Sequence, residues 1–445
     1  MPTFVHVSDI HFGQEKRNGE IVVNNDVKER LIEDATRELV RIGRHPAAGI
    51  LLTGDVAFAG KASQYQAAGE WLDRLAAAIG CPKTAVHIVP GNHDVDRLEI
   101  SNGVELMLRE IAEQGEATLD KYLANATDRR ILYGRFGAYV PFAEAYNCPL
   151  DSEGGLAGDK PVPLGNSRTL RFIGLNTALT CSKGDKEEGR LVVGAKQRVL
   201  PITPGEELII LAHHPMAWLR DGPDALAYIR NRARVLITGH EHNPTVTQET
   251  TPDGQQLLIL SAGATVPPSD ERLLYTYNLI DFTLCGNDAS IEVTVHPRSW
   301  RDDKKDFEGD LAPLRGQDPN FTLRCPNFGL PPAAPASTDE VAKRAAVDRE
   351  VVPAPEGPKQ VEFEPVSDEF AFALLRFFRD LSPGQRVRVL VRLGALPDDW
   401  SDELSHAIER QVLDRLERAQ RLSQLSEAMD WVTAADSDGG NRNND

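Results

Sequence analysis

The sequence has few cysteines and no long apolar run. Its 445 residues include five cysteines, an odd number, and none stands in a Cys-x-x-Cys pair. This excludes a disulfide framework of the secreted kind and favours a reduced, cytoplasmic protein. No stretch reaches the roughly 18 apolar residues of a membrane span. The first residues enter a strand pattern directly, without a basic segment or cleavage site, so we expect no signal peptide.

Positive charge is also scarce. Lys and Arg number 49 against 67 Asp and Glu, which gives a formal charge of −18. Such a surface repels nucleic acid unless basic residues are concentrated locally. The charge therefore counts against a broad DNA-binding groove, although it leaves open a small nucleotide or a single strand held by metal ions. The sequence also lacks an internal repeat and a Gly-rich nucleotide-binding loop.

The length and the hydrophobic content of 41% fit a globular protein of two domains. Strand-like runs alternate with amphipathic helical patterns at 26–44 and 62–79, the rhythm of a mainly parallel sheet with helices on its faces. Farther along the chain the apolar period becomes two, which predicts a second sheet with antiparallel strands on the first. The runs of this period are 245–251, 255–261, 275–282 and 289–295.

Four further segments complete the expected organisation. Residues 104–146 look helical and follow one of the polar motifs described next, so they are a candidate cap over a site; the alternative is a helical insertion packed beside the sheet. A first domain would cover residues 1–330. It would be followed by a Pro-rich linker at 331–365, a bundle of four or five helices at 366–432 and a disordered tail at 433–445.

Five short polar motifs each follow an apolar, strand-like run. In an open α/β sheet, ligands gather beyond the carboxyl ends of the strands, so these motifs are expected to meet. Taken singly, each has a structural alternative: a turn for Gly-Asp, or a buried, hydrogen-bonded histidine. The motifs are Asp9-Ile10-His11, Gly54-Asp55, Gly91-Asn92-His93-Asp94, His213-His214-Pro215 and Gly239-His240-Glu241-His242.

Aspartate, histidine and asparagine together form the ligand set of a two-metal phosphoester-cleaving site. Two divalent cations about 3.5–4 Å apart lower the pKa of bound water, orient it and neutralise the developing charge. Ions held that close need an anionic ligand between them, and imidazoles select transition metals over magnesium or calcium.

In residue type and order, the motifs resemble those of the calcineurin-like metallophosphoesterase superfamily over residues 1 to about 295. The resemblance implies an α/β fold, a four-layer α/β/β/α sandwich. It also implies two transition-metal ions (Mn, Fe or Zn, with manganese for activity) and hydrolysis by a metal-activated water. His93 would act on the leaving group and Asp94 would orient it; of the two adjacent histidines, the family pattern favours His213, and His214 stays uncertain. The implied metal ligands are Asp9, His11 and His242 for one ion, Asn92, His213 and His240 for the other, and Asp55 as the bridge.

Three functions remain open at this stage. The motifs at Asp9 and Asn92 look closer to bacterial cyclic-nucleotide phosphodiesterases and nucleases than to phosphoprotein phosphatases, so a phosphodiesterase comes first. A phosphomonoesterase is the second reading. An interaction protein with a regulatory metal domain is the third, and the intact ligand set argues against it.

The C-terminal bundle offers no catalytic cluster. Its Leu381-Ser382-Pro383 segment, its Arg392 to Pro397 segment and Trp400 resemble small bacterial effector-associated, death-like adaptor domains. That resemblance implies recruitment to a protein partner with a matching helical domain, in signalling or antiphage defence. The alternative is an oligomerisation or stabilising bundle without a partner.

Overall fold

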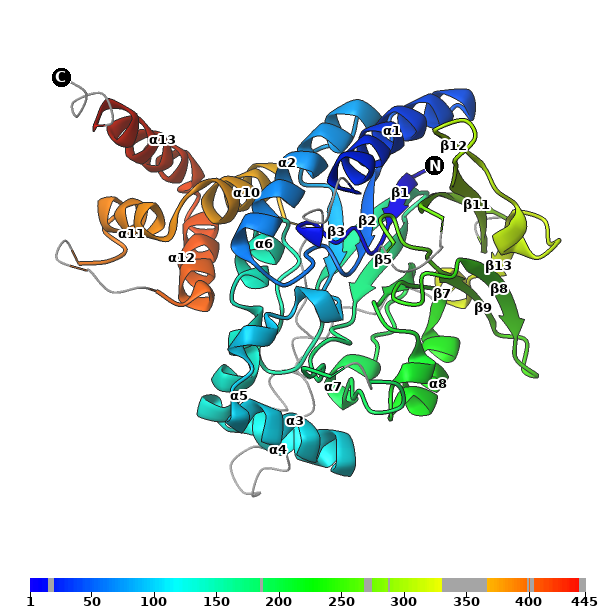
Figure 1. The fold of residues 1–445 in the computed structure, drawn as a ribbon, viewed down its shortest axis with the longest axis horizontal. Coiled ribbons are helices and arrows are strands. Elements are labelled where there is room, and N and C mark those ends of the chain that lie inside the picture. The colour runs from blue at the N-terminus through cyan, green and yellow to red at the C-terminus, as the bar shows by residue number, and fades with distance from the viewer. Residues whose placement is uncertain are drawn as a thin grey trace, which may run out of the picture.

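Two stacked β-sheets form the centre of the protein, and helices cover their outer faces (Figure 1). This α/β sandwich, seen in a computed structural model, confirms the expected fold class. The structure describes residues 1–14, 20–184, 187–267, 274–286, 289–329, 366–397, 400 and 404–439. The expected linker at 331–365 lies outside these residues.

The first sheet combines the first three strands of the chain with the last four. Its order is β12-β11-β10-β1-β2-β3, with β13 paired to β11. Its β1, β2 and β3 are parallel, and β10 pairs antiparallel with β1. The bounds are β1 Thr3–Val7, β2 Gly49–Thr53, β3 Val86–Val89, β10 Thr276–Cys285, β11 Ser290–Arg301, β12 Asp306–Gly309 and β13 Asn320–Arg324.

The second sheet has the order β4-β5-β6-β7-β9-β8, with β5, β6, β7 and β9 parallel. The expected second sheet with antiparallel strands is present, but the four late strands are divided between the sheets, because β8 and β9 extend this sheet whereas β10 and β11 return to the first. An alternating pattern shows that a strand has two different faces and does not show which edge it pairs with. The bounds are β4 Asp159–Gly165, β5 Arg168–Gly174, β6 Glu206–Leu211, β7 Ala233–Thr238, β8 Thr245–Thr250 and β9 Gln256–Ser261.

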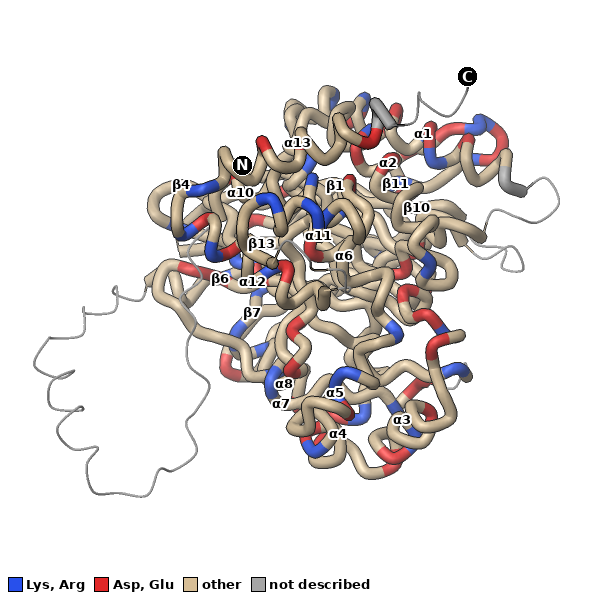
Figure 2. The backbone as a smooth tube through the Cα atoms, turned by 90° about the vertical axis from the view of Figure 1, so that its left-hand side faces the viewer, with Lys and Arg blue, Asp and Glu red and all other residues tan. Residues whose placement is uncertain are grey.

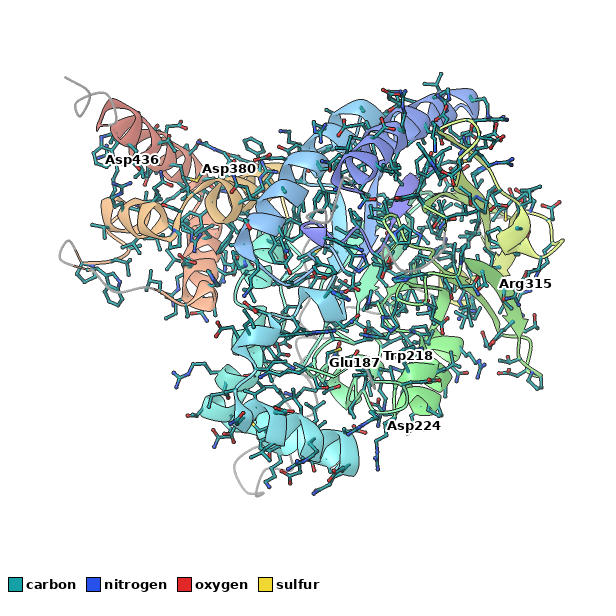
Figure 3. The ribbon with its side chains drawn as sticks, viewed as in Figure 1. Glu187, Trp218, Asp224, Arg315, Asp380 and Asp436 are labelled. Carbon is teal, nitrogen blue, oxygen red and sulfur yellow. The ribbon has the colours of Figure 1, made fainter. Side chains whose placement is uncertain are left out.

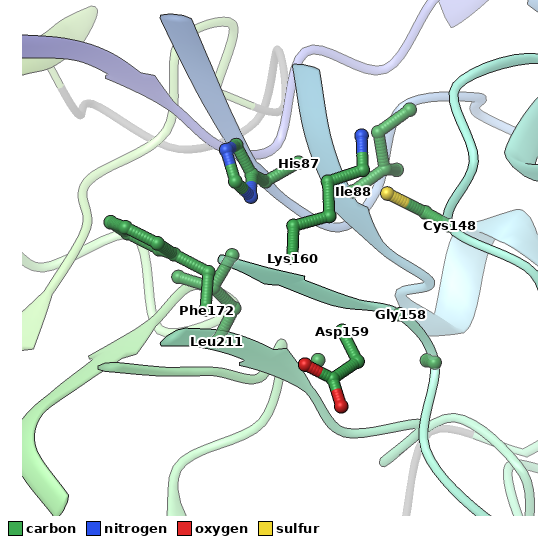
Figure 4. Close-up of a pocket in the computed structure, with 10 residues that line it drawn as sticks. His87, Ile88, Cys148, Gly158, Asp159, Lys160, Phe172 and Leu211 are labelled. Carbon is green, nitrogen blue, oxygen red and sulfur yellow. The ribbon is translucent and has the colours of Figure 1, made fainter. Parts of the chain in front are cut away.

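Apolar side chains fill the space between the sheets. The rings of Phe4, Phe172 and Phe282 pack with centroids 5.0–6.0 Å apart. A cavity of about 10 Å³ remains there beside His87 and Lys160, room for about one water molecule (Figure 4). None of the motif residues lines this cavity, and its volume is too small for an organic substrate.

The outer helices are α1 Glu20–Arg41 and α2 Ala62–Ile79 on the first sheet, and α7 Ala195–Arg198 and α8 Gly222–Arg232 on the second. The helix expected at 62–79 is α2, and its inward face carries Trp71, Leu72 and Leu75, which are buried. Among the described helices, none combines the length and apolar character needed to cross a bilayer. Figure 2 shows acidic and basic positions mixed along the surface helices.

The helical insertion consists of α3 Asn102–Gln114, α4 Glu116–Ala124, α5 Ala126–Tyr133 and α6 Tyr139–Ala145. Arg220 donates to the carbonyl of Ala112 at 2.9 Å, and Arg198 pairs with Glu116 at 2.5 Å. These contacts hold α3 and α4 beside the loops that follow β5 and β6. A cap over the motifs stays a prediction.

The C-terminal bundle contains α10 Asp368–Leu375, a π-helical turn at Arg376–Asp380, α11 Pro383–Arg392, α12 His406–Arg418 and α13 Leu422–Gly439. Ser382 and Gln385 form a capping box at the start of α11. The expected tail is wrong for residues 433–439, because α13 continues through Gly439. Its apolar residues as far as Val432 hold the helix against the bundle, and a polar composition alone did not reveal this continuation.

The bundle is docked on the sandwich and does not stand apart from it. Arg379 pairs with Asp73 of α2 at 2.6 Å. Arg410 of α12 pairs with Glu144 of α6 at 3.0 Å and donates to Asn147 at 2.9 Å. Apolar residues of the bundle and of α6 belong to one continuous core. The composition break in the sequence therefore does not correspond to a gap between two bodies.

We predict that Arg410→Ala weakens this docking. Glu144 is 6% exposed, and its carboxylate would lose its cationic partner. Breaking a buried pair from one side costs about 3 kcal/mol, and chemical denaturation should show a fall of that size in the free energy of unfolding. The control is Arg418→Ala on the same helix, at an exposed position. Equal stability of the two variants would show that the Arg410 contact does not hold the bundle in place.

Candidate metal centre

The loops after β1, β2, β3, β6 and β7 bring the five motifs together. The first group of donor atoms belongs to Asp9, His11 and His242, which lie within 4.8 Å of one another. The Nε2 atom of His242 is 3.2 Å from Oδ1 of Asp9. All three residues come from loops that continue buried strands, as the sequence predicts.

The second group belongs to Asn92, His213 and His240. The Nε2 atom of His213 lies 3.0 Å from Oδ1 of Asn92 and 3.2 Å from Nδ1 of His240. The same Nδ1 atom of His240 is 3.2 Å from Oδ1 of Asn92. The three donor atoms thus face a common point.

Asp55 lies between the two groups. Its Oδ2 atom is 3.3 Å from Nε2 of His11 and 3.4 Å from Nε2 of His213. Its Oδ1 atom accepts a hydrogen bond from the backbone N–H of His93 at 2.8 Å. One carboxylate therefore faces both donor groups, the arrangement required of a bridging ligand.

The hydrogen bonds at Nδ1 of His11 and His213 show how these two rings are oriented, and so whether cations fit between them and Asp55. The Nδ1 atoms of His11 and His213 lie 3.1 and 2.8 Å from the carbonyls of Val266 and Thr53. Carbonyls only accept, so each Nδ1 carries a hydrogen, and each Nε2 faces Asp55 with either a lone pair or a second hydrogen. Facing lone pairs repel unless a cation or a proton lies between them. The donor set therefore fits divalent transition metals.

The electrostatics support the same conclusion. Burial opposes charge on His213, yet the Asp55 carboxylate raises its pKa to about 10. Burial likewise opposes charge on Asp55, and His213 and His93 hold its pKa well below the ordinary value. Burial opposes charge on Asp9 as well, but the hydrogen bond from His242 and the nearby charges of His213 and His242 together lower its pKa to about 2. The site thus keeps buried carboxylates ionised and attracts positive charge to the space between them.

The backbone around the donors is strained. Five of the seven predicted ligands have positive φ: Asp9 54°, His11 52°, Asp55 51°, His240 70° and His242 54°. Such conformations are costly outside glycine and gather at functional sites. Close approach also requires Gly91, where a Cβ atom would come 2.1 Å from Oδ1 of Asp55. These features indicate loops built to aim their side chains.

His93 lies beside the two donor groups, and its two ring nitrogens have different surroundings. Its Nδ1 atom lies 2.8 Å from the carbonyl of Phe58, so Nδ1 donates and Nε2 is left for a reacting group. The Phe58 ring stacks on the imidazole with centroids 5.3 Å apart. Burial lowers the pKa of His93, because it disfavours the charged ring.

Asp94 does not orient His93 directly, contrary to the prediction. Its carboxylate accepts four hydrogen bonds within the described residues, from the backbone of Val56, Ala57 and Gly91 and from the hydroxyl of Tyr65. It therefore ties the loop after β2 to the loop after β3. The Gly-Asn-His-Asp motif alone does not show which backbone N–H groups donate hydrogen bonds to its last aspartate.

Of the two adjacent histidines, His213 is the one that joins the donor groups. The Nδ1 atom of His214 turns instead to Thr177 Oγ1, at 2.9 Å. Sequence reasoning missed two aromatic neighbours of the site, Phe58 and Trp218. The Trp218 ring packs on His240 at 4.2 Å, and Figure 3 shows this tryptophan in the lower centre of the fold. Neither aromatic belongs to a motif, so only their position in space reveals them.

Comparisons with known proteins agree with this geometry. A family model described as calcineurin-like phosphoesterase matches residues 2–244, and one described as GTPase-associated adaptor domain matches residues 370–431. An uncharacterised metallophosphoesterase-like protein of Bacillus subtilis, YydB, is 34% identical over 94 residues. That match covers 21% of this chain and 18% of the relative's length.

Solved structures with a similar arrangement are more distant in sequence. Vps29 of Chaetomium thermophilum is 12% identical, with 76% of this chain and 100% of that chain covered and a TM-score of 0.28. The purple acid phosphatase PPD1 of yellow lupin is 11% identical, with 76% and 57% covered and a TM-score of 0.34.

We predict that Asp55→Ala loses at least one metal ion per chain and its hydrolytic activity, because both donor groups depend on the same carboxylate. Elemental analysis of the purified variant measures the loss. The exposed Asp224→Ala is the control and should keep the wild-type metal content. Full metal occupancy in the Asp55 variant would falsify the bridging role.

Proposed function

The chain belongs to the calcineurin-like phosphoesterase family, and from that membership and the geometry of its site we propose that it hydrolyses phosphodiester bonds. Family membership itself indicates a metal-dependent phosphoester hydrolase with a dinuclear centre. The observation that supports the proposal most strongly is the position of Asp55 between two groups of donors, with His93 at their border.

The roles of the residues follow from their positions. We assign Asp9, His11 and His242 to one ion, Asn92, His213 and His240 to the other, and Asp55 to both, with manganese as the activating metal. Two such ions supply an attacking water at neutral pH and neutralise charge on the phosphoryl oxygens.

The chain's own groups handle the proton and the orientation. His93 holds its Nδ1 hydrogen against the Phe58 carbonyl, so its Nε2 atom is the one that would take up a proton from water and pass it to the departing ester oxygen. Asp94 fixes the two loops that carry Phe58 and His93 and acts as a positioning residue. Tyr65 completes the cage of Asp94 from α2.

The aromatic neighbours favour a diester over a monoester. Phe58, which is 40% exposed, packs beside His93, and Trp218 packs on His240 in the other donor group. A phosphate held between the groups would have an apolar, flat surface on either side. A diester has two organic substituents to place on such surfaces, whereas a monoester has one. Cyclic nucleotides and nucleic-acid fragments are diesters of this kind.

We predict that the manganese-loaded protein cleaves bis(p-nitrophenyl) phosphate with a kcat/KM at least about tenfold above that for p-nitrophenyl phosphate. That ratio corresponds to about 1.4 kcal/mol of additional transition-state stabilisation. A second test is the variant His93→Ala, which should keep its metals and lose about 10²–10⁴-fold in turnover on a diester with a poor leaving group. A preference for the monoester would identify a phosphomonoesterase. Absence of hydrolysis in the metal-loaded protein would instead indicate an interaction protein with a regulatory metal domain.

We propose further that the C-terminal bundle recruits the enzyme to a partner with a matching helical domain, in bacterial signalling or defence. The match to a GTPase-associated adaptor domain supports this, and the bundle supplies none of the assigned ligands. Phe372, Ile408 and Trp431 are large apolar side chains that are 46–52% exposed on its helices. Apolar groups of this size at a surface are typical of contacts with another protein.

We predict that Trp431→Asp weakens association with a second protein carrying the same kind of adaptor domain by at least about tenfold in Kd, and leaves diester hydrolysis unchanged. Aromatic anchors commonly contribute 2 kcal/mol or more, by the order of magnitude found at interfaces. Titration calorimetry with full-length proteins measures the change, and the exposed Arg418→Ala serves as the control. If Trp431→Asp binds as tightly as the wild type, Trp431 is not part of the contact.

A further inference from the structure

A further group of metal-type donor atoms lies behind the assigned centre. It consists of Cys181, Glu187 and His214, whose donor atoms fall within 4.8 Å of one another. Cys181 and His214 are 0% exposed and Glu187 is 4% exposed. None of the three has a role in the hydrolysis proposed above, and Figure 3 shows Glu187 in the lower centre of the fold.

The spacing within this group is long for a hydrogen bond from the ring to the carboxylate. The Nε2 atom of His214 lies 3.8 Å from Oε2 of Glu187, beyond the 2.7–3.2 Å typical of such bonds in proteins. It lies 3.9 Å from Sγ of Cys181. Around one tetrahedral zinc ion, bond lengths of about 2.0–2.3 Å place neighbouring ligand atoms roughly 3.3–3.6 Å apart. The observed separations exceed that range by a few tenths of an ångström.

The other side of the His214 ring is arranged as metal-binding histidines usually are. Its Nδ1 atom lies 2.9 Å from Oγ1 of Thr177, and the same oxygen accepts the backbone N–H of His214 at 3.1 Å. In the tautomer whose Nδ1–H donates to Thr177, the Nε2 lone pair faces the sulfur and the carboxylate. A hydrogen bond of this kind from the second nitrogen orients a ligand histidine.

Contacts from two sides hold Glu187 and the backbone at Cys181. Glu187 Oε1 accepts the backbone N–H of Ser182 at 3.2 Å, which leaves Oε2 directed at His214. Arg135 of the insertion is 1% exposed and donates to the carbonyls of Leu179 and Cys181. The three donors are therefore held by two backbone segments, the loop after β5 and the loop after β6.

We propose that Cys181, Glu187 and His214 bind a third divalent ion, zinc by preference, separate from the dinuclear centre. A thiolate favours zinc over manganese, magnesium or calcium. Three protein ligands leave the fourth tetrahedral position to a water molecule. The ion would connect Cys181 and Glu187 to His214, the neighbour of His213, and so stabilise the position of the second donor group.

The sulfur atom makes this site distinguishable from the assigned centre, whose donors are only nitrogen and oxygen. In protein loaded with cobalt, a thiolate ligand gives a charge-transfer absorption in the near ultraviolet that imidazole and carboxylate ligands do not give. The full-length wild-type protein should show this absorption, and the zinc-loaded protein should show one sulfur neighbour of zinc by X-ray absorption. Neither measurement depends on activity, so their outcome is independent of the proposed hydrolysis.

Two variants and one control complete the test. Cys181→Ser should abolish the cobalt absorption, and both Cys181→Ser and Glu187→Gln should lower the metal content by about one ion per chain. Cys148→Ser is the matched control, since Cys148 is also buried and its thiol lies near the carbonyls of Val86 and Tyr146. It should retain both signals.

The wild-type measurements decide the matter even if a variant fails to fold. A wild-type protein with full dinuclear occupancy, no thiolate absorption and no sulfur neighbour at zinc would overturn the proposal. An absorption that persists in Cys181→Ser would overturn the assignment of its sulfur ligand.

Discussion

The buried carboxylate of Asp55 is the constraint on which the rest of the site depends. It is 1% exposed, and an isolated ion at such a depth is strongly unfavourable unless positive charge compensates it. The backbone N–H of His93 supplies one hydrogen bond, and two histidines direct nitrogen atoms at the other oxygen. Carbonyls of Thr53 and Val266 prevent those rings from turning away. A cation on either side of Asp55 satisfies all of these groups together.

The elements that could be predicted from sequence are those in which local pattern and chemistry coincide. Asp9 and Asp55 each follow a buried strand, so their meeting at one edge of the first sheet follows from the geometry of parallel strands. His213 follows β6 of the second sheet, and only the stacking of the two sheets brings it to the same place. The partition of late strands was not predictable, since the pairing of β10 with β1 joins segments more than 270 residues apart, as Thr3 and Asp281 show. The same holds for Asp94, Phe58 and Trp218, whose partners are distant in sequence or are backbone atoms without a sequence signature.

The composition of the sequence suggests two separate halves, but the C-terminal bundle packs directly against the sandwich. Arg379 pairs with Asp73 of α2, the helix that also carries Tyr65, whose hydroxyl donates to Asp94. Phe142 of α6 packs against Tyr65 with ring centroids 5.0 Å apart, and Tyr146 packs on Phe142 at 5.2 Å. The surface that receives the bundle is thus built from the same two helices that support the loop of His93. Recruitment through the bundle would carry the catalytic sandwich along as one body.

Anomalous X-ray diffraction from crystals grown with manganese tests the central claim most directly. The account predicts two manganese peaks about 3.5–4 Å apart, one on each side of the Asp55 carboxylate and each within bonding distance of its own donor group. A single peak, or peaks that leave Asp55 on only one ion, would contradict the account.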